Sequence, residues 1–312
     1  MKGKKEIQLA NLNCTFGTVE EKASPMLEYF TEIIYPAFKR KKKYRTLFFD
    51  EIKIGENKKI GYYLYGKIIR DTTLEVKSRY DWEKEMLIDT DEKYRTSPFS
   101  EFILMLNNHK LLFIPGSKGH PRLSSFKSLL KNNINNIIKV NNRQSISENE
   151  FPPIYSFDVI EIPKSANVLE DIKKFEEIKS FSLEFIKLNP EPLSGLLQNI
   201  DSIRERCGSN SSTYTMKNPK NKEVIAEIIQ ESNGLANFSM KAKKQEDVEI
   251  REYKNDNFKE VRELILPEHE SLDNNINLVI NDSFNDQRIN SAPKAEKNLY
   301  KRAIEKLKAL VL

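Results

Sequence analysis

The sequence predicts an α+β fold of two domains, each with a mixed or mainly antiparallel sheet and packed helices, ending in a C-terminal amphipathic helix. Strand-like and helix-like segments alternate along the chain, and neighbouring strand-like segments are joined by hairpin turns. A length of 312 residues with 38% hydrophobic content is sufficient for two cores. We expect domains at 1–143 and 154–312 and a linker at 144–153, where turn formers and paired prolines interrupt the pattern.

The first domain is expected to begin with a strand and a helix. Residues 5–12 alternate apolar and polar side chains, which is typical of a strand. Ser24 and Pro25 suit the N-cap and first turn of a helix, because apolar residues then recur at helical spacing as far as residue 38. Pro36 is expected to end or kink this helix.

Further strands follow. Segments 46–54 and 60–69 are rich in aromatic and β-branched residues and predict a strand pair, with another strand at 72–78. Segments 102–106 and 110–115 predict a hairpin with a two-asparagine turn.

A helix is expected from Pro121 to about Lys139. One face is apolar and faces the core, whereas the opposite face is basic and polar. The apolar positions are Leu123, Phe126, Leu130, Ile134 and Ile137; the polar ones are Ser124, Lys127, Ser128, Lys131 and Asn135.

The second domain is expected to alternate strands and helices before a late hairpin. The predicted elements are strand 155–162, helix 165–176, strand 180–188, helix 192–206, a polar loop from 207, helix 219–233, hairpin strands 236–244 and 247–254, and the amphipathic helix 293–312.

The most informative feature for function is the absence of acids from residues 102–147. The chain has 46 Asp and Glu in 312 residues, so about seven are expected in this window. It contains instead seven Lys or Arg, with His109 and His120. Residues 1–150 hold 27 Lys or Arg and 19 Asp or Glu, whereas the remainder holds 24 and 27. This uneven charge favours a polyanionic partner, of which nucleic acid is the commonest.

Two groups of residues are candidates for nucleic-acid binding. One is the basic run Lys39, Arg40, Lys41, Lys42, Lys43 and Arg45, for which a solvated helix C-terminus is the alternative interpretation. The other comprises Lys118, His120 and Arg122 in a glycine-containing loop before a helix, continued by Lys127 and Lys131 on that helix. An ordinary strand-to-helix turn is the alternative for the loop. Such contacts would read the phosphate backbone and depend strongly on salt.

Aromatic side chains offer a second possible contribution. Tyr80, Trp82 and the tyrosines at 62, 63 and 65 have the chemistry to stack on bases. Core packing is the commoner fate of such residues, so we do not count them as site residues.

An enzyme is less well supported. Three histidines and two cysteines lack metal-ligand spacing, and phosphate-loop, dinucleotide-binding and nucleophile-elbow motifs are absent from the sequence. The alternative is a Mg²⁺-dependent nuclease with Asp50 or Asp71 beside the triplet Glu75-Val76-Lys77, or with Glu51-Ile52-Lys53 as the triplet. Acid-x-Lys occurs eight times, however, as expected by chance in so charged a chain.

The chain is expected to be cytoplasmic and not inserted in a membrane. Its apolar runs are far shorter than the ~20 residues of a membrane span, and its start lacks the apolar region of a secretory signal. Cys14 and Cys207 are too few for a disulfide framework. We expect no cofactor unless the nuclease alternative holds.

The order of elements resembles that of RexA-like phage-exclusion proteins, of KwaB-like proteins of the Kiwa defence system and of an uncharacterised bacterial family. The similar segments are LYGKI at 64–68, the hairpin region 97–115, LNPEPL at 188–193 and the late hairpin at 238–253. The resemblance implies a DNA-binding protein of bacterial phage defence or abortive infection, with a possible partner protein. It implies no catalytic residue.

The sequence therefore predicts a non-enzymatic, largely sequence-independent DNA-binding protein of anti-phage defence. The nuclease is one alternative. A scaffold subunit of a defence complex, forming a homo-oligomer through the C-terminal helix, is another.

Overall fold

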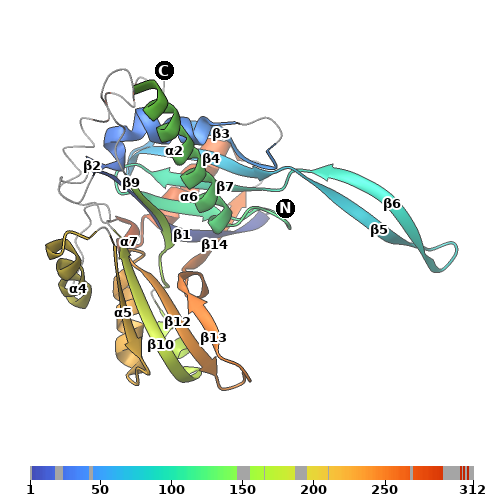
Figure 1. Cartoon of the computed structure of the whole chain (residues 1–312). Coiled ribbons are helices and arrows are strands. Elements are labelled where there is room, and N and C mark those ends of the chain that lie inside the picture. Colours follow the sequence, from blue (N-terminus) through green and yellow to red (C-terminus); the bar gives the residue numbers. More distant parts are fainter. Residues whose placement is uncertain are drawn as a thin grey trace.

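A computed structural model shows the predicted α+β fold, with antiparallel sheets packed against helices (Figure 1). The structure describes residues 2–17, 24–41, 45–145, 155–164, 166–186, 195–209, 211–267 and 270–290, together with Ala303, Glu305 and Lys308.

The larger sheet has eight strands and takes them from both halves of the chain. Its order is β14-β1-β8-β7-β4-β3, and β2 and β9 also pair with β1. The strands are β1 (Lys2–Phe16), β2 (Ser24–Pro25), β3 (Leu47–Asn57), β4 (Gly61–Arg70), β7 (Phe99–Met105), β8 (Lys110–Ile114), β9 (Tyr155–Glu161) and β14 (Val261–Pro267). The predicted strand pair and hairpin are confirmed by the antiparallel pairs β3–β4 and β7–β8.

This sheet is buried on both faces because helices cover each side. Alternate residues of β7 point to opposite cores: Phe102 and Leu104 join one cluster, whereas Ile103 and Met105 join the other. The first cluster is closed by α1 (Tyr35–Lys39) and α2 (Leu123–Ser145), and the second by α6 (Leu272–Ser283) and α7 (Gln287–Asn290). Double burial explains why these strands are continuous apolar runs.

The first helical segment continues past the predicted break at Pro36. A 3-10 turn (η1, Met26–Tyr29) and a π-helical turn (η2, Phe30–Ile34) lead directly into α1. Pro36 lies in the first turn of α1, where its missing N–H is not needed by the helix. Pro36 was expected to end or kink the helix. The helix does not end there, but it changes from π to α geometry one residue before the proline.

Strands β5 (Thr72–Asp81) and β6 (Met86–Thr96) form a separate two-stranded ribbon that projects far from the body (Figure 1). We call this ribbon the arm. The sequence predicted its first strand at 72–78 but not its partner β6.

The smaller sheet has the order β11-β10-β12-β13 and is packed on helices from the second half. Its strands are β10 (Phe175–Ile186), β11 (Ser211–Lys217), β12 (Asn237–Lys244) and β13 (Arg251–Lys254); the helices are α3 (Val168–Lys173), α4 (Gly195–Arg206) and α5 (Lys222–Ser232), and η3 (Asn255–Asn257) follows β13. The late hairpin is confirmed by the β12–β13 pair. Strand β11 occupies the segment expected to be a polar loop, so that expectation was wrong.

The division between the two sheets does not coincide with the predicted linker. Residues 146–154 lie outside the described part of the chain, but β9 follows them and still pairs with β1. The chain returns to the larger sheet through β14. Most of the predicted C-terminal helix also lies outside the described residues; within it Ala303, Glu305 and Lys308 are helical, and Ala303 is buried in the first core.

Among the described residues, we find no helix that combines the length and the apolar character needed to span a bilayer.

Candidate nucleic-acid interface

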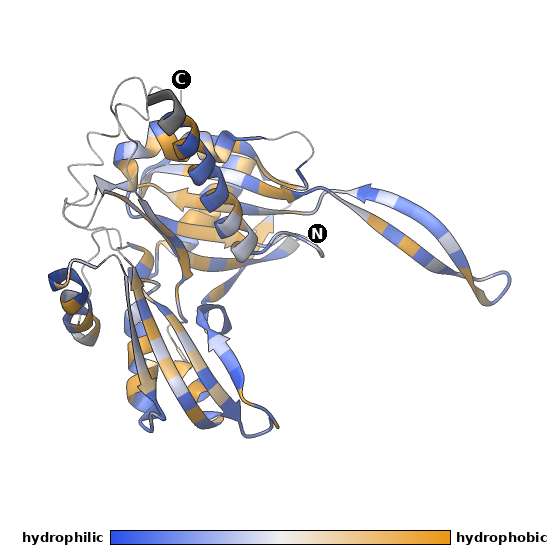
Figure 2. Ribbon diagram, in the orientation of Figure 1, coloured by the Kyte–Doolittle hydropathy of each residue, from blue (hydrophilic) through white to orange (hydrophobic). Residues whose placement is uncertain are grey.

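Helix α2 presents a polar outer face without any acidic residue. Its inner face buries Leu123, Phe126, Leu130 and Ile134 against the larger sheet, as predicted. The described residues of α2 that face solvent are Ser124, Ser128, Lys131, Asn132, Lys139 and Val140. Figure 2 shows hydrophilic residues on the outward turns of α2, above hydrophobic strands. The helix is therefore amphipathic, and its outward face carries hydroxyl, amide and ammonium groups as far as Lys139, followed by the exposed apolar residue Val140.

Four exposed cations follow this face and the loop that precedes it. They are Lys118, Arg122, Lys131 and Lys139, and we call them the α2 ridge. Within the described part of the chain, no carboxylate lies at ion-pair distance from any of the four. From Arg122 to Lys139 the helix rises about 26 Å. The ridge is thus an elongated group of exposed charges that no carboxylate of the described residues neutralises.

The loop before α2 is held firmly to the sheet. The amide of His120 donates to the Ser117 carbonyl at 3.1 Å, and the hydroxyl of Ser100 donates to the Pro121 carbonyl at 2.8 Å. Nδ1 of His120 lies 3.0 Å from that same hydroxyl. The half-buried His120 ring therefore fixes the loop to β7, whereas Lys118 projects into solvent. Of the predicted loop residues, Lys118 and Arg122 are the exposed ones.

The helix begins slightly later than predicted. The amide of Phe126 donates to the Arg122 carbonyl at 3.1 Å, so helical bonding begins at Arg122 rather than at Pro121. Free N–H groups of a first turn point back along the helix axis. The loop that carries Lys118 immediately precedes this turn.

Lys127 does not belong to the ridge. Its ammonium group forms an ion pair with Asp158 of β9, and Asp158 is 7% exposed. Asn237 of β12 also donates to Asp158, at 2.8 Å. The prediction that Lys127 extends the outward line of charge toward Lys131 was therefore wrong. Asp158, which neutralises Lys127, lies outside the acid-free window of residues 102–147. The sequence around Lys127 therefore does not reveal this ion pair.

The basic run at 39–45 is engaged mainly in contacts within the protein. The ammonium of Lys39 lies 4.5 Å from the ring centroid of Tyr35, and that of Lys41 pairs with Asp50 at 2.6 Å. Arg45 donates to the side-chain oxygen of the buried Asn133 at 3.3 Å. Arg40 is half-buried beside α2, and Lys42 and Lys43 lie outside the described residues.

The nuclease candidates are separated in the structure. Asp50 lies on β3, where Lys41 holds the pKa of its carboxyl below the usual range. Glu75 and Lys77 lie on the arm, and Glu75 pairs with Lys93 at 2.9 Å. Asp50 is paired in register with Lys67, and the chain from Lys67 to Glu75 is extended over about 26 Å.

The carboxylates of the remaining nuclease candidates are also paired with basic side chains. Asp71 accepts two hydrogen bonds from Arg95, at 2.6 and 3.1 Å, and Glu51 pairs with Lys67 at 2.7 Å. Among the described residues, no group of three His, Cys, Asp or Glu is arranged to hold a metal ion. Asp50, Glu75 and Lys77 thus do not meet at one point.

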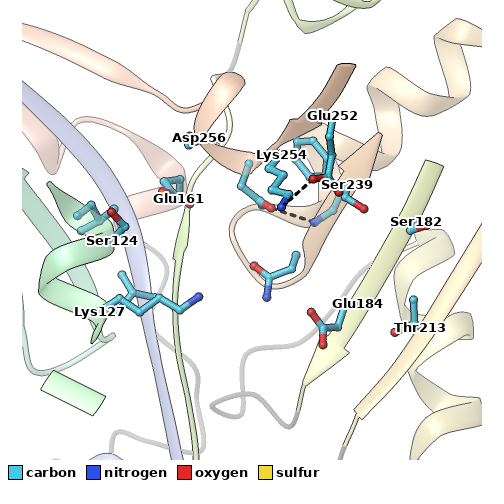
Figure 3. A pocket seen from close by; sticks show the side chains of 15 residues that line it. Ser124, Lys127, Glu161, Ser182, Glu184, Thr213, Ser239, Glu252, Lys254 and Asp256 are labelled. Atoms are coloured by element: carbon cyan, nitrogen blue, oxygen red, sulfur yellow. Dashed lines mark hydrogen bonds and ion pairs between the residues drawn. The ribbon is translucent and has the colours of Figure 1, made fainter. Parts of the chain in front are cut away.

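A polar cleft of about 560 Å³ lies between the two sheets (Figure 3). Its charged lining consists of Lys127, Glu161, Glu184, Glu252, Lys254 and Asp256. Lys254 pairs with Glu252 at 2.9 Å, and burial raises the pKa of Glu161, with nearby Asp256 adding to the effect. Four carboxylates against two lysines make this cleft unsuited to a polyanion. The outer face of α2 is the better surface for one.

The candidate aromatic residues have two different fates. Tyr62, Tyr63 and Tyr65 are 7%, 5% and 1% exposed and belong to the core, as expected. Tyr80 and Trp82 lie at the end of the arm, and Trp82 is 84% exposed. Sequence reasoning missed this distinction because it missed β6, the strand that turns the segment into a projecting ribbon.

Comparison with known proteins yields no assignment: no protein-family model matches the sequence, and no curated protein matches it.

Proposed function

We propose that this chain is a non-enzymatic, largely sequence-independent DNA-binding protein that contacts the phosphate backbone through the α2 ridge. The observation that carries the proposal is the group of four exposed cations on α2 and the loop before it, a segment without acidic residues. An anion approaching this face meets neither a competing carboxylate of α2 nor a neutralised cation. Attraction of this kind is the main source of non-specific binding to DNA.

The dimensions of the ridge suit a duplex. A rise of about 26 Å corresponds to roughly seven or eight base pairs at 3.4 Å each. The serines and asparagines between the cations are able to donate to phosphate oxygens, which are the commonest hydrogen-bonding partners in protein–DNA complexes. These groups position a duplex without reading its bases, which supports binding that depends little on sequence.

A role in phage defence is part of the same proposal and is supported by the resemblance to RexA-like and KwaB-like proteins. If it holds, the ridge is required for protection. Cells expressing a ridge variant then lose protection in a plaque assay, whereas cells expressing a matched control variant keep it.

Charge reversal of the ridge tests DNA binding. The ridge variant replaces Lys118, Arg122, Lys131 and Lys139 by Glu. The control variant replaces Arg206, Lys217, Lys220 and Lys241 by Glu; these are three lysines and one arginine that are exposed in the second half of the chain. Both variants change the net charge equally, so they differ only in where the charge is lost.

Electrophoretic mobility shifts with a 30-base-pair duplex at several salt concentrations provide the measurement. We expect the wild type and the control to bind at low salt and the ridge variant to lose binding at least a hundredfold. Equal loss in both variants would show that bulk charge alone binds DNA. Equal affinity in the wild type and the ridge variant would show that another surface binds. Supercoiled plasmid should remain intact with Mg²⁺ throughout.

A further inference from the structure

The arm is an amphipathic ribbon. Its register places Leu74 opposite Tyr94 and Tyr80 opposite Leu87, all on one face. The ring of Trp82 contacts that of Tyr80 at a centroid distance of 4.9 Å and so extends this face to the tip. The opposite face pairs Glu75 with Lys93 and Thr73 with Arg95. Leu74, Tyr80, Trp82, Leu87 and Tyr94 are each between 45% and 84% exposed. The polar residues Glu92, Ser78 and Asp89 separate Leu74 and Tyr94 from the apolar cluster at the tip. That cluster comprises Tyr80, Trp82 and Leu87, and exposed apolar side chains gathered in this way are typical of an interaction site.

The arm is acidic, in contrast to the body that bears it. Residues 72–96 hold five Lys or Arg and seven Asp or Glu, whereas the rest of 1–150 holds 22 and 12. Acids flank the exposed indole at the tip, since Trp82 lies between Asp81 and Glu83. Asp81 also accepts hydrogen bonds from the amides of Glu83 and Lys84, at 2.9 and 3.2 Å, which orders the turn. A nucleic acid is a poor partner for this tip, and a basic protein surface is a good one.

The body carries a pocket with the complementary chemistry. A depression of about 480 Å³ lies between α1 and α2 and is mostly apolar. Tyr35, Pro36, Ile137 and Val140 line it, and Lys39 and Arg40 add positive charge. Among the described residues, Nη1 of Arg40 is buried without a hydrogen-bond partner. An indole with a carboxylate on either side would fill the apolar part and supply acceptors for the guanidinium group.

We propose that the arm of one copy of this chain inserts Trp82 into the pocket between α1 and α2 of a second copy. The tip lies about 36 Å of extended chain from Asp71 at the edge of the body, and the arm points away from both sheets (Figure 1). Insertion is therefore between molecules. The contact joins two different surfaces, so it is heterologous and builds rings or chains rather than a symmetric pair. It requires no DNA and is independent of the proposed DNA binding.

Sedimentation velocity without nucleic acid tests the proposal over a range of protein concentrations. The wild type is expected to form species larger than the 36.4 kDa monomer as concentration rises. Trp82→Ala removes the inserted group, and Val140→Asp places an acid at an exposed position in the pocket wall. Each is expected to weaken assembly at least about tenfold, as is typical for loss of a central tryptophan. Met86→Ala is the matched control, because Met86 is equally part of the arm but lies opposite Asp81 on the other face.

Mixing the two variants gives the decisive result. Trp82→Ala retains an intact pocket and Val140→Asp retains an intact arm, so an equimolar mixture should form one-to-one dimers and nothing larger. Thermal melts monitored by circular dichroism establish that both variants are folded. A monomeric wild type, assembly unaffected by either substitution, or folded variants that do not recover dimers on mixing would each overturn the proposal. Loss of assembly in Trp82→Ala alone would indicate that arms pair with one another, which also contradicts it.

Discussion

The ammonium group of Lys110 donates a hydrogen bond of 2.7 Å to the side-chain oxygen of Asn11, and both residues are buried. The amide group of Asn11 in turn donates to the backbone carbonyl of Asn233 at 2.7 Å. Strands β8 and β1 are thereby connected to the turn between α5 and β12 of the smaller sheet. Lys110 is one of the seven cations in the acid-free window, yet it contributes to the interior and not to the surface charge.

Replacement of Asn11 by Leu should destabilise the protein by at least about 2 kcal/mol, because it removes an acceptor from a buried ammonium and a donor from a buried carbonyl. Urea unfolding monitored by circular dichroism measures the change. The double variant Asn11→Leu/Lys110→Met removes the buried charge as well and should regain part of the loss. If the double variant is destabilised by the sum of the two single losses, the two side chains act independently.

Gly234 approaches the same network from the other side. Its φ is +71°, and a Cβ at this position would lie 2.9 Å from the amide nitrogen of Asn11 and 3.1 Å from the Ile160 carbonyl oxygen. Gly234→Ala should therefore cost about 1–3 kcal/mol through backbone strain and displacement of Asn11. Gly119→Ala is the informative comparison, because its φ of +86° is also positive but its nearest neighbour is a Pro98 side-chain atom at 3.7 Å. Equal losses in the two variants would mean that crowding at Asn11 contributes nothing.

Lys127 should affect stability without affecting the binding of DNA. Lys127→Met leaves the largely buried carboxylate of Asp158 without its cation, although the amide groups of Asn237 and Val159 still donate to it. We expect a loss of about 1–2 kcal/mol. The salt dependence of DNA binding should remain that of the wild type, since the ammonium is already neutralised. A reduced salt slope in Lys127→Met would place this residue on the DNA-binding surface.

Single substitutions in the ridge should weaken the binding of DNA without changing stability. Four phosphate contacts predict a plot of log K against log salt concentration with a slope of about −3.6. Lys131→Gln and Lys139→Gln should each reduce the magnitude of the slope by about one and weaken binding equally for duplexes of different sequence. Fluorescence anisotropy with two unrelated duplexes measures both effects. Weakening confined to one duplex would show that the residue reads bases.

The parts of the fold that the sequence predicted are those whose cores impose a regular pattern. The runs at 102–106 and 110–115 predicted β7 and β8, because burial on both faces leaves few positions for polar residues. The spacing of Leu123, Phe126, Leu130 and Ile134 predicted α2 for the corresponding reason. Strands β6 and β11 were missed because they are largely exposed and rich in polar residues, so that pairing with β5 and β10 alone defines them.

The candidate site could be predicted only in part, because charge composition does not reveal ion pairing. Lys131 and Lys139 face solvent, whereas Lys110 is buried and Lys127 pairs with Asp158. All four have the same local context of missing acids. The partners of Lys110 and Lys127 come from β1 and β9, which are distant in the sequence. Only the folded structure therefore distinguishes these two engaged lysines from the exposed Lys131 and Lys139.

The pH dependence of stability tests whether Glu161 is desolvated in the cleft between the two sheets. Burial, with a smaller contribution from Asp256, raises the pKa of its carboxyl above the ordinary value of 4.5. The folded protein then retains this proton at pH values where the unfolded chain has lost it. The free energy of unfolding should therefore fall as the pH rises from 4.5 through the folded-state pKa. Glu161→Gln cannot ionise and avoids this loss. Urea unfolding measures the stability of Glu161→Gln relative to the wild type, and this difference should increase between pH 4.5 and 7.5. If the difference in the free energy of unfolding is constant over this range, Glu161 is not held in a desolvated position.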